Sequence, residues 1–146
     1  MTLEGRPPIR CLHDCLFTPD GRFLVYAGQT TGAPAIGDLW TRPTEGGWTS
    51  APQPEPPARQ LYALATRGDA AWVFGGGAQD RSKLGDLWRL DLAALTWELA
   101  QLEGAAPSAR SGATFVHDES GDRLLLFGGL TDDGESAETW ALGFGG

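Results

Sequence analysis

Two types of potential metal ligand alternate near the start of the chain, where Cys11, His13 and Cys15 occupy every second position. Residues two apart in a β-strand point to the same face, so neighbouring members could share one metal ion. A strand cannot bring all three to one tetrahedral ion, and no second cluster with zinc-like spacing follows. In a regular strand the two cysteines lie about 13 Å apart, too far for a disulfide. We therefore expect neither a metal site nor a cofactor, and we interpret His13 as a packed, hydrogen-bonded histidine.

A second group of titratable residues comprises His117, Asp118, Glu119 and Asp122. Paired carboxylates of this kind can serve acid–base chemistry. Nothing in the sequence places a nucleophile or a positioned water beside them, and a glycine between the acids indicates a tight turn. We interpret the group as a solvated hairpin, and an enzyme is the less favoured class of function.

The sequence contains a pattern that is repeated three times, and each copy begins near an arginine. Arg10, Arg59 and Arg110 each follow a proline-containing segment. After each arginine comes an apolar run that ends in small residues, and then an acid followed two residues later by tryptophan. The small residues Gly28, Gly76 and Gly129 are 48 and 53 residues apart, which indicates three copies of one structural repeat.

Each unit predicts a meander of antiparallel strands. The first strands are expected near residues 11–17, 60–66 and 111–117, and the apolar second strands over 23–28, 71–76 and 124–129. Glycine-rich turns at 19–21, 67–69 and 120–122 join them as tight hairpins. Variable loops over 29–36, 77–84 and 130–136 precede third strands that carry Trp40, Trp88 and Trp140. Fourth strands begin at Trp48 and Trp97, and the third unit lacks its outer strand.

Composition narrows the possible partners. The chain has 146 residues, enough for one domain, with 21 glycines, 10 prolines and 6 tryptophans, which is typical of a turn-rich β protein. The net charge of -8 would repel the phosphates of nucleic acid. No apolar run approaches the roughly 20 residues of a membrane span, and the N-terminus lacks the pattern of a signal peptide. We expect a cytoplasmic protein with no nucleic-acid or membrane partner.

The repeated pattern resembles the kelch repeat, which builds the blades of β-propellers. The middle unit carries all the marks of that family: Arg59, Gly75, Gly76, Asp86, Leu87, Trp88 and Trp97. The departures are Ala27 for the first glycine of unit one, Thr139 for the aliphatic residue of unit three, and the missing fourth strand of unit three. The resemblance implies an all-β fold in one domain over residues 1–146, with blades at about 7–55, 56–106 and 107–146.

Three blades are fewer than the four to eight that close a propeller, so the outer faces of the first and third blades need a cover. We favour a homodimer in which blade three of one chain meets blade one of the other to complete six blades. The alternatives are a fragment of a longer propeller and assembly with a different chain. Both terminal units are net negative, which weighs against self-association.

Antiparallel connectivity places the loops between second and third strands on the same side as the segments that link blades. Variable loops on a rigid frame are the usual place for binding residues. The candidate surface comprises Gln29, Thr30, Thr31, Gln79, Asp80, Arg81, Lys83, Asp132, Asp133 and Glu135, with Arg10, Arg59 and Arg110 beginning on the same side.

The kelch resemblance implies that this surface recognises a partner protein. Each arginine has two interpretations: it bridges backbone carbonyls between neighbouring blades, or it points into a ligand site near the central channel. The alternative function is binding or isomerisation of a sugar-like molecule in that channel, because some kelch propellers are enzymes, and Arg59 and Arg110 are only loose candidates for such a pocket.

Overall fold

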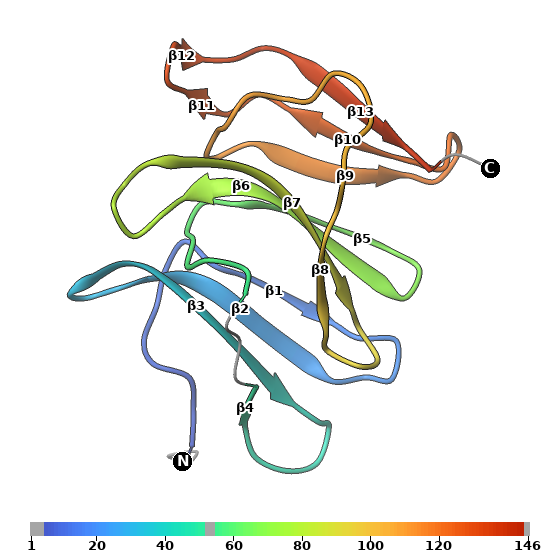
Figure 1. Cartoon of the computed structure of the whole chain (residues 1–146). Coiled ribbons are helices and arrows are strands. Elements are labelled where there is room, and N and C mark those ends of the chain that lie inside the picture. The colour runs from blue at the N-terminus through green and yellow to red at the C-terminus, as the bar shows by residue number, and fades with distance from the viewer. Residues whose placement is uncertain (1–4, 52–54, 145–146) are drawn as a thin grey trace.

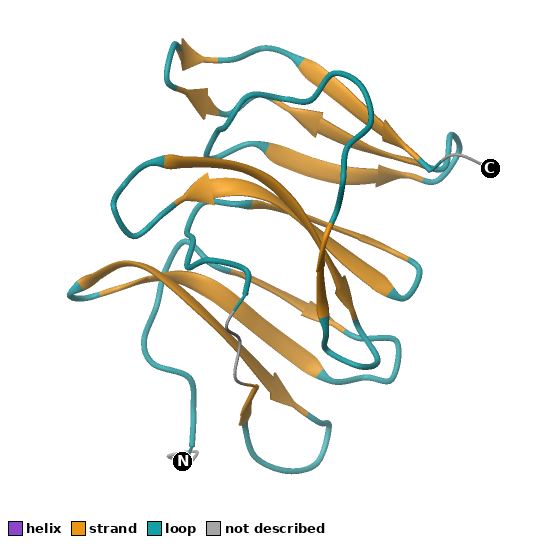
Figure 2. Cartoon of the chain, viewed as in Figure 1, coloured by secondary structure: helices purple, strands orange, loops and turns teal. Residues whose placement is uncertain are grey.

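The computed structural model describes residues 5–51 and 55–144, which form a stack of three antiparallel β-sheets (Figures 1 and 2). The described residues contain no helix that could cross a membrane. The sheets follow one another along the chain, and each belongs to one repeat unit. The stack confirms the predicted all-β blades, and the proline-containing segment at 52–54 lies outside the described residues.

The first two blades are four-stranded meanders. Blade 1 has the strand order β1-β2-β3-β4, and blade 2 has the order β5-β6-β7-β8. Their bounds are β1 Asp14–Phe17, β2 Phe23–Thr30, β3 Ala33–Arg42, β4 Thr49–Ala51, β5 Ala63–Arg67, β6 Ala70–Gly77, β7 Lys83–Asp91 and β8 Trp97–Leu99.

Blade 3 has three long strands in the order β13-β10-β9, and a small two-stranded sheet, β11-β12, lies beyond one end. Within the described part of the chain no strand pairs with the free edge of β13, as the sequence predicted. The bounds are β9 Thr114–Asp118, β10 Arg123–Phe127, β11 Leu130–Thr131, β12 Gly134–Glu135 and β13 Thr139–Gly143.

The first strand of each blade begins three residues later than the sequence analysis placed it. Leu12 and Leu61 have φ values of 54° and 49°, and Gly112, in the same position of blade 3, has 69°. A left-handed residue interrupts the pleat, so alternation does not extend back across it. The prediction of one regular strand through Cys11, His13 and Cys15 is therefore wrong, and with it the prediction that their side chains share a face.

The expected eight-residue loops between second and third strands are also shorter in blades 1 and 2. There β2 and β3 continue to a tight turn around Gly32. In blade 2, β6 extends to residue 77 and β7 begins at residue 83. The sequence analysis did not extend the strands into these segments because their residues are polar. Strands that pair at the end of a hairpin need no apolar face. Gln29 and Thr30 thus lie in β2, Lys83 lies in β7, and Glu135 lies in β12.

Aromatic and aliphatic side chains fill the space between blades 1 and 2. Leu24, Tyr26 and Leu39 of blade 1 pack against Val73 and other residues of blade 2. Tyr62 fastens the two sheets, because its hydroxyl donates to the Tyr26 carbonyl at 2.7 Å and accepts the Asp14 amide at 2.7 Å. A second cluster joins blades 2 and 3: Ala63, Ala65, Phe74, Leu87, Phe115, Leu124 and Leu126.

The small-residue pair at the end of each second strand forms a bulge. Ala27, Gly75 and Gly128 have φ values of 53°, 63° and 72°, and the register between β2 and β3 and between β6 and β7 shifts at this point. The position therefore needs a left-handed residue in every blade, and Ala27 adopts that conformation in place of glycine. At Gly75 a Cβ atom would lie only 2.5 Å from the Arg110 carbonyl oxygen of the next blade.

Two glycine-to-alanine substitutions distinguish the cost of a left-handed backbone from the cost of a clash with the next blade. Gly68 has φ 58° and open space where a Cβ atom would lie, whereas Gly75 has φ 63° and the Arg110 carbonyl against it. We expect Gly68→Ala to cost about 1 to 2 kcal/mol from the left-handed backbone alone. Gly75→Ala should cost about 1 to 3 kcal/mol more, because blade 3 must move away. Urea denaturation of both variants checks this, and equal losses would contradict the close approach.

Candidate functional site

Arg59 occupies the centre of blade 2 with its side chain fully buried. Its Nη1 and Nη2 atoms donate to the two carboxylate oxygens of Asp86 at 2.9 and 2.8 Å. Nη1 also donates to the Gly75 carbonyl at 2.9 Å, and Nε donates to the Pro57 carbonyl at 3.2 Å. Trp88 Nε1 donates to Asp86 at 2.6 Å. One arginine thus joins the leading segment, the second strand and the third strand of its blade.

The same arrangement recurs in blade 1. Arg10 makes two hydrogen bonds to Asp38, at 2.6 and 2.9 Å, and donates to the Ala27 carbonyl at 3.0 Å. Trp40 Nε1 donates to Asp38 at 2.6 Å.

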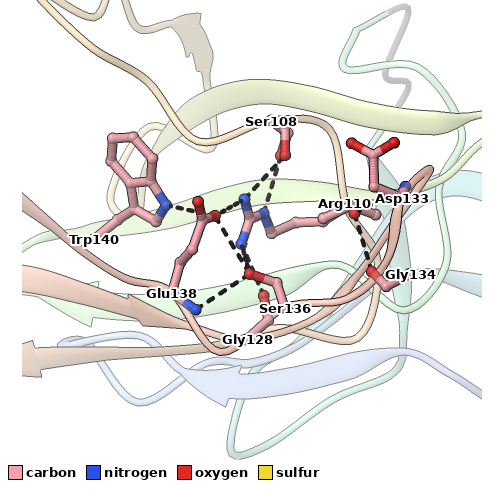
Figure 3. A network of polar contacts seen from close by, with 9 residues as sticks. Ser108, Arg110, Gly128, Asp133, Gly134, Ser136, Glu138 and Trp140 are labelled. Atoms are coloured by element: carbon pink, nitrogen blue, oxygen red, sulfur yellow. Dashed lines mark hydrogen bonds and ion pairs between the residues drawn. The ribbon is translucent and has the colours of Figure 1, made fainter.

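Blade 3 replaces the aspartate by glutamate (Figure 3). Arg110 donates to Glu138 at 2.7 Å and to the Gly128 carbonyl at 3.0 Å, and Trp140 Nε1 donates to Glu138 at 3.1 Å. Ser136 Oγ lies within hydrogen-bonding distance of both charged groups. The Arg59 pattern is therefore present in all three blades.

The arginines also lower the pKa values of their acidic partners. Burial by itself raises the pKa of Asp86, but the hydrogen bonds and charge of Arg59 and the indole of Trp88 outweigh it, so the pKa lies below its ordinary value. The pKa of Asp38 is lowered in the same way by Arg10. Hydrogen bonds from Arg110 lower the pKa of the more exposed Glu138.

The backbone of each arginine binds the preceding blade. The Gly28 amide donates to the Arg59 carbonyl at 2.9 Å, and the Arg59 amide donates to the Ile36 carbonyl at 3.1 Å. Arg110 makes the same pair of bonds to blade 2, with Gly76 and Leu84. Each of these two arginines therefore holds its own blade with its side chain and the blade before it with its main chain.

A third hydrogen bond crosses each junction at the left-handed residues. The Leu61 amide donates to the Leu12 carbonyl at 3.2 Å, and the Gly112 amide donates to the Leu61 carbonyl at 2.7 Å. The left-handed backbone points these amide and carbonyl groups away from their own sheets and towards the neighbouring blade. The residues just before each first strand therefore help to join the blades.

The structure gathers part of the predicted binding surface around one hollow of about 740 Å³. Gln29, Thr30, Arg81 and Lys83 line it from blades 1 and 2. Leu130 of blade 3 contributes an exposed apolar side chain. The lining of the hollow therefore combines polar and cationic side chains with the apolar side chains of Leu61 and Leu130, which is an arrangement that can bind both side chains and backbone of a ligand.

Other predicted residues hold the loops to one another and do not line the hollow. Gln79 Oε1 accepts the Ala35 amide of blade 1 at 3.2 Å, and Lys83 Nζ lies 3.1 Å from Asp132 of blade 3. Asp80 accepts hydrogen bonds within its own turn, from Ser82. Thr31, Asp133 and Glu135 are not among the residues that line the hollow.

The arginines lie beneath this surface. The side chains of Arg10, Arg59 and Arg110 are at most 4% exposed, and all three nitrogens of each guanidinium donate within the chain. Sequence reasoning did not pair them with Asp38, Asp86 and Glu138. The available signal was a nearly constant separation between arginine and acid, of 28, 27 and 28 residues.

The two other groups of titratable residues are not among those that line the hollow. Cys11 and Cys15 are free and exposed, and residues 5–51 and 55–144 contain no group of three or more metal-ligating side chains. His13 is exposed as well, so the expectation of a packed core histidine is wrong. In the hairpin cluster, Asp122 pairs with Arg67 of blade 2 at 2.7 Å and lies 3.3 Å from His117 Nε2. These contacts lower the pKa of Asp122 to about 2, so the group is an ionised link between hairpins.

Comparison with known proteins agrees with this geometry. A family model described as the KLHDC2/KLHL20/DRC7 Kelch-repeats domain matches residues 1–144. Kelch domain-containing protein 2 of Bos taurus is 37% identical over 97 residues, which is 65% of this chain and 21% of the relative. The dynein alpha chain of the flagellar outer arm of Chlamydomonas reinhardtii is 30% identical over 133 residues, 85% of this chain and 3% of the relative.

Host cell factor 2 of Homo sapiens is 33% identical over 104 residues, 68% of this chain and 12% of the relative. The chain thus spans 21% or less of the length of these three relatives.

Stacked meander sheets, each with one buried arginine that binds an acid next to a tryptophan, are the blades of a β-propeller-type protein. The family match extends over nearly the whole sequence. The chain belongs to the kelch-repeat family.

The acid partner of Arg59 gives a pH-dependent test of this arrangement. Because the folded pKa of Asp86 is depressed, its ion pair stabilises the protein fully above the unfolded pKa of about 3.9 and loses its effect as the pH falls through the lower folded pKa. We expect Asp86→Asn to lower the free energy of unfolding by about 3 to 5 kcal/mol at pH 7, because it leaves a buried guanidinium uncompensated.

The difference between wild type and Asp86→Asn should shrink as the pH falls below about 4. Denaturant titrations at pH 7 and at pH 3 measure both values. Glu119→Gln is the control, because Glu119 is exposed on a hairpin. A pH-independent difference would show that the charge of Asp86 is not what the buried arginine requires.

Proposed function

We propose that the chain is a non-catalytic recognition module that binds a partner protein through the surface formed by its β2–β3, β6–β7 and β11–β12 turns. The observation that carries this proposal is the convergence of Gln29, Thr30, Arg81 and Lys83 on one hollow whose lining also includes the apolar Leu61 and Leu130. Loops held by rigid sheets are the common location of binding residues. The membership of the chain in the kelch-repeat family supports a protein ligand.

Cross-blade contacts give this surface a fixed shape. The Ala35–Gln79 hydrogen bond and the Lys83–Asp132 ion pair connect the turns of all three blades. The buried arginines support the turns from below through the bulge carbonyls. A surface that is ordered before binding loses little conformational entropy when the partner docks.

Substitutions on this surface test the recognition function. Arg81→Ala and Asp133→Ala should weaken capture of the partner and leave the free energy of unfolding within about 0.5 kcal/mol, because both side chains are exposed. Affinity capture followed by mass spectrometry identifies the partner, and titration of the purified partner gives the change in affinity. Glu119→Ala, in a hairpin at the opposite ends of the sheets, is the matched control. Equal binding by all three variants would contradict the proposed surface.

Part of the proposal is that two copies complete a six-bladed ring. In blades 1 and 2, the face towards the next blade is covered by that blade. The same face of blade 3 is exposed. Tyr26 and Phe74 are each 3% exposed because the next blade covers them, whereas Phe127, in the same position of blade 3, is 54% exposed. On the open face of blade 1, Phe17 is 69% exposed.

The hydrogen-bonding groups of the two open faces are complementary. In the described residues the Gly129 amide and the carbonyls of Ser136 and Gly112 have no partner, and they correspond to the groups that hold the next blade elsewhere. Blade 1 offers the matching carbonyl and amide of Arg10 and the amide of Leu12. Blade 1 of a second copy could therefore form the same hydrogen bonds with blade 3 that join neighbouring blades within one chain.

Ala137 makes a junction between two copies less favourable than the junctions within one chain. A Cβ at Gly37 or Gly85 would lie 3.1 Å from the Cα of Ala58 or Ala109 of the next blade, and blade 3 has Ala137 at this position. The residue that would approach Ala137 from a second copy is Ile9, which is larger than alanine. We therefore expect the junction between copies to be weaker than the junctions within one chain.

Sedimentation equilibrium tests this assembly. The wild type should form a concentration-dependent dimer of twice 15.5 kDa. Phe127→Asp should be monomeric, because it buries a charge in the junction. Ala137→Gly should dimerise more tightly, because it removes the crowding Cβ. A wild type that stays at 15.5 kDa at every concentration would contradict self-association and would favour a longer propeller or a different chain as the cover.

A further inference from the structure

We infer, on the basis of the proposed function, that the hollow of the binding surface recognises an internal segment of a partner protein in which an aliphatic side chain lies next to an acidic one. Leu61 and Leu130 contact the aliphatic side chain, and Arg81 binds the carboxylate. Leu61 and Arg81 have left-handed backbone conformations that are unfavourable for residues with large side chains.

The side chain of Leu61 has no role in holding the blades together. The φ of Leu61 is 49° and the residue is 39% exposed, and it belongs to neither of the apolar clusters between blades. Blade 3 has Gly112 in the same position with φ 69°, so glycine is compatible with the backbone there. The amide and carbonyl of Leu61 bond to Leu12 and Gly112, and a glycine would supply the same two groups. The isobutyl group is therefore available for a ligand in the hollow.

Leu130 adds a second exposed aliphatic side chain to the hollow, from blade 3. It is 45% exposed and lies outside both interblade clusters. Its backbone pairs with Ser111, and the residues that make the same bridge in blades 1 and 2 are Gln29 and Gly77, so the fold does not require an apolar residue here. An aliphatic ligand side chain that covers Leu61 and Leu130 would remove apolar surface from water, which is favourable.

The hollow has two cationic side chains, and only one has an acidic partner in the described residues. Lys83 Nζ lies 3.1 Å from Asp132, whereas the guanidinium of the exposed Arg81 makes neither an ion pair nor a hydrogen bond within residues 5–51 and 55–144. The φ of Arg81 is 71°, at a hairpin position where glycine is favoured. The turn is closed by the Ala78 amide, which donates to the Ser82 carbonyl at 2.8 Å, and does not depend on the arginine side chain.

These features together define the chemistry of the ligand. Unfavourable backbone conformations persist where a side chain is needed for function, and here two of them bring their side chains to one hollow. A guanidinium binds a carboxylate through two parallel, charge-assisted hydrogen bonds, and the leucines beside it favour an aliphatic group. The hollow of about 740 Å³ also has room for main chain on both sides of these two ligand side chains, so an internal segment fits it.

Panning of a phage-displayed random heptapeptide library on the full 146-residue chain tests this chemistry. Each displayed peptide continues into the coat protein, so it presents no free carboxyl terminus. We expect the enriched sequences to carry Asp or Glu within two positions of Leu, Ile or Val. Enrichment of sequences that lack an acidic residue, or no enrichment at all, would overturn the proposal.

The most enriched sequence is then made as an amidated, fluorescein-labelled peptide and titrated with the chain. Replacement of its acidic residue by the corresponding amide should weaken binding by about 10-fold or more in fluorescence anisotropy, because the charge-assisted pair is lost. Arg81→Gly should weaken binding of the acidic peptide and leave that of the amide peptide nearly unchanged, because the two changes remove the same interaction. Losses that simply add would overturn the pairing of Arg81 with the acid.

Leu61→Gly and Leu12→Gly are a matched pair of variants. Both leucines are left-handed and similarly exposed, at 39% and 41%, but only Leu61 is among the residues that line the hollow. Glycine accepts this backbone, so neither change should lower the urea midpoint of unfolding. Leu61→Gly should weaken peptide binding by about 10-fold or more, and Leu12→Gly by less than about twofold. Equal effects of the two variants would overturn the aliphatic contact.

The partner-capture experiment of the proposed function separates two kinds of failure. If Arg81→Ala and Asp133→Ala leave capture unchanged, the recognition surface itself is wrong. If they weaken capture and Leu61→Gly does not, the surface stands and the ligand chemistry inferred here is overturned.

A second copy of the chain is an alternative occupant that the peptide titration detects. Peptide binding that falls as the concentration of the chain rises, and that Phe127→Asp restores, would assign the hollow to a second copy and overturn its assignment to a partner protein.

Discussion

The buried arginine of each blade is the interaction on which the rest of the structure depends. Arg59 and Arg110 bind an acid and a bulge carbonyl of their own blade through the side chain, and they bind the preceding blade through the main chain. A buried guanidinium is unfavourable without a charged partner and full hydrogen bonding, and here both are supplied. The bulge, the acid on the third strand and the leading segment are therefore parts of one arrangement, and the aromatic clusters pack around it.

This arrangement also separates the residues that support the blades from the proposed binding surface. The guanidinium groups are fully engaged inside the blades, so the residues free to contact a ligand are those of the turns above them, such as Arg81. The third blade carries two further features that the first two do not: an uncovered face with Phe127, and an unpaired edge at β13 beside an open hollow. Each follows from the absence, in the described residues, of a neighbour that the repeat supplies elsewhere.

Much of the fold was predictable from the sequence because the repeat is strong: the turns, the apolar second strands and the fourth strands near Trp48 and Trp97 are where the spacing placed them. The start of the first strand was not predictable, because Leu12 and Leu61 adopt a left-handed conformation that leucine rarely takes. The acid partner of each arginine was missed because the pair is distant in sequence. The hollow beside β13 could not be anticipated, because it is defined by packing between two blades rather than by any motif.

The most direct test of the arginine's role is amide hydrogen exchange at the two blade junctions. The Gly28 amide reports on the junction made by Arg59, and the Gly76 amide reports on the junction made by Arg110. Arg110→Met keeps the aliphatic stem and removes the charge, and it should accelerate exchange at Gly76 while Gly28 stays protected. Unchanged protection at Gly76, or an equal loss at both glycines, would contradict the central role of the buried arginine in joining neighbouring blades.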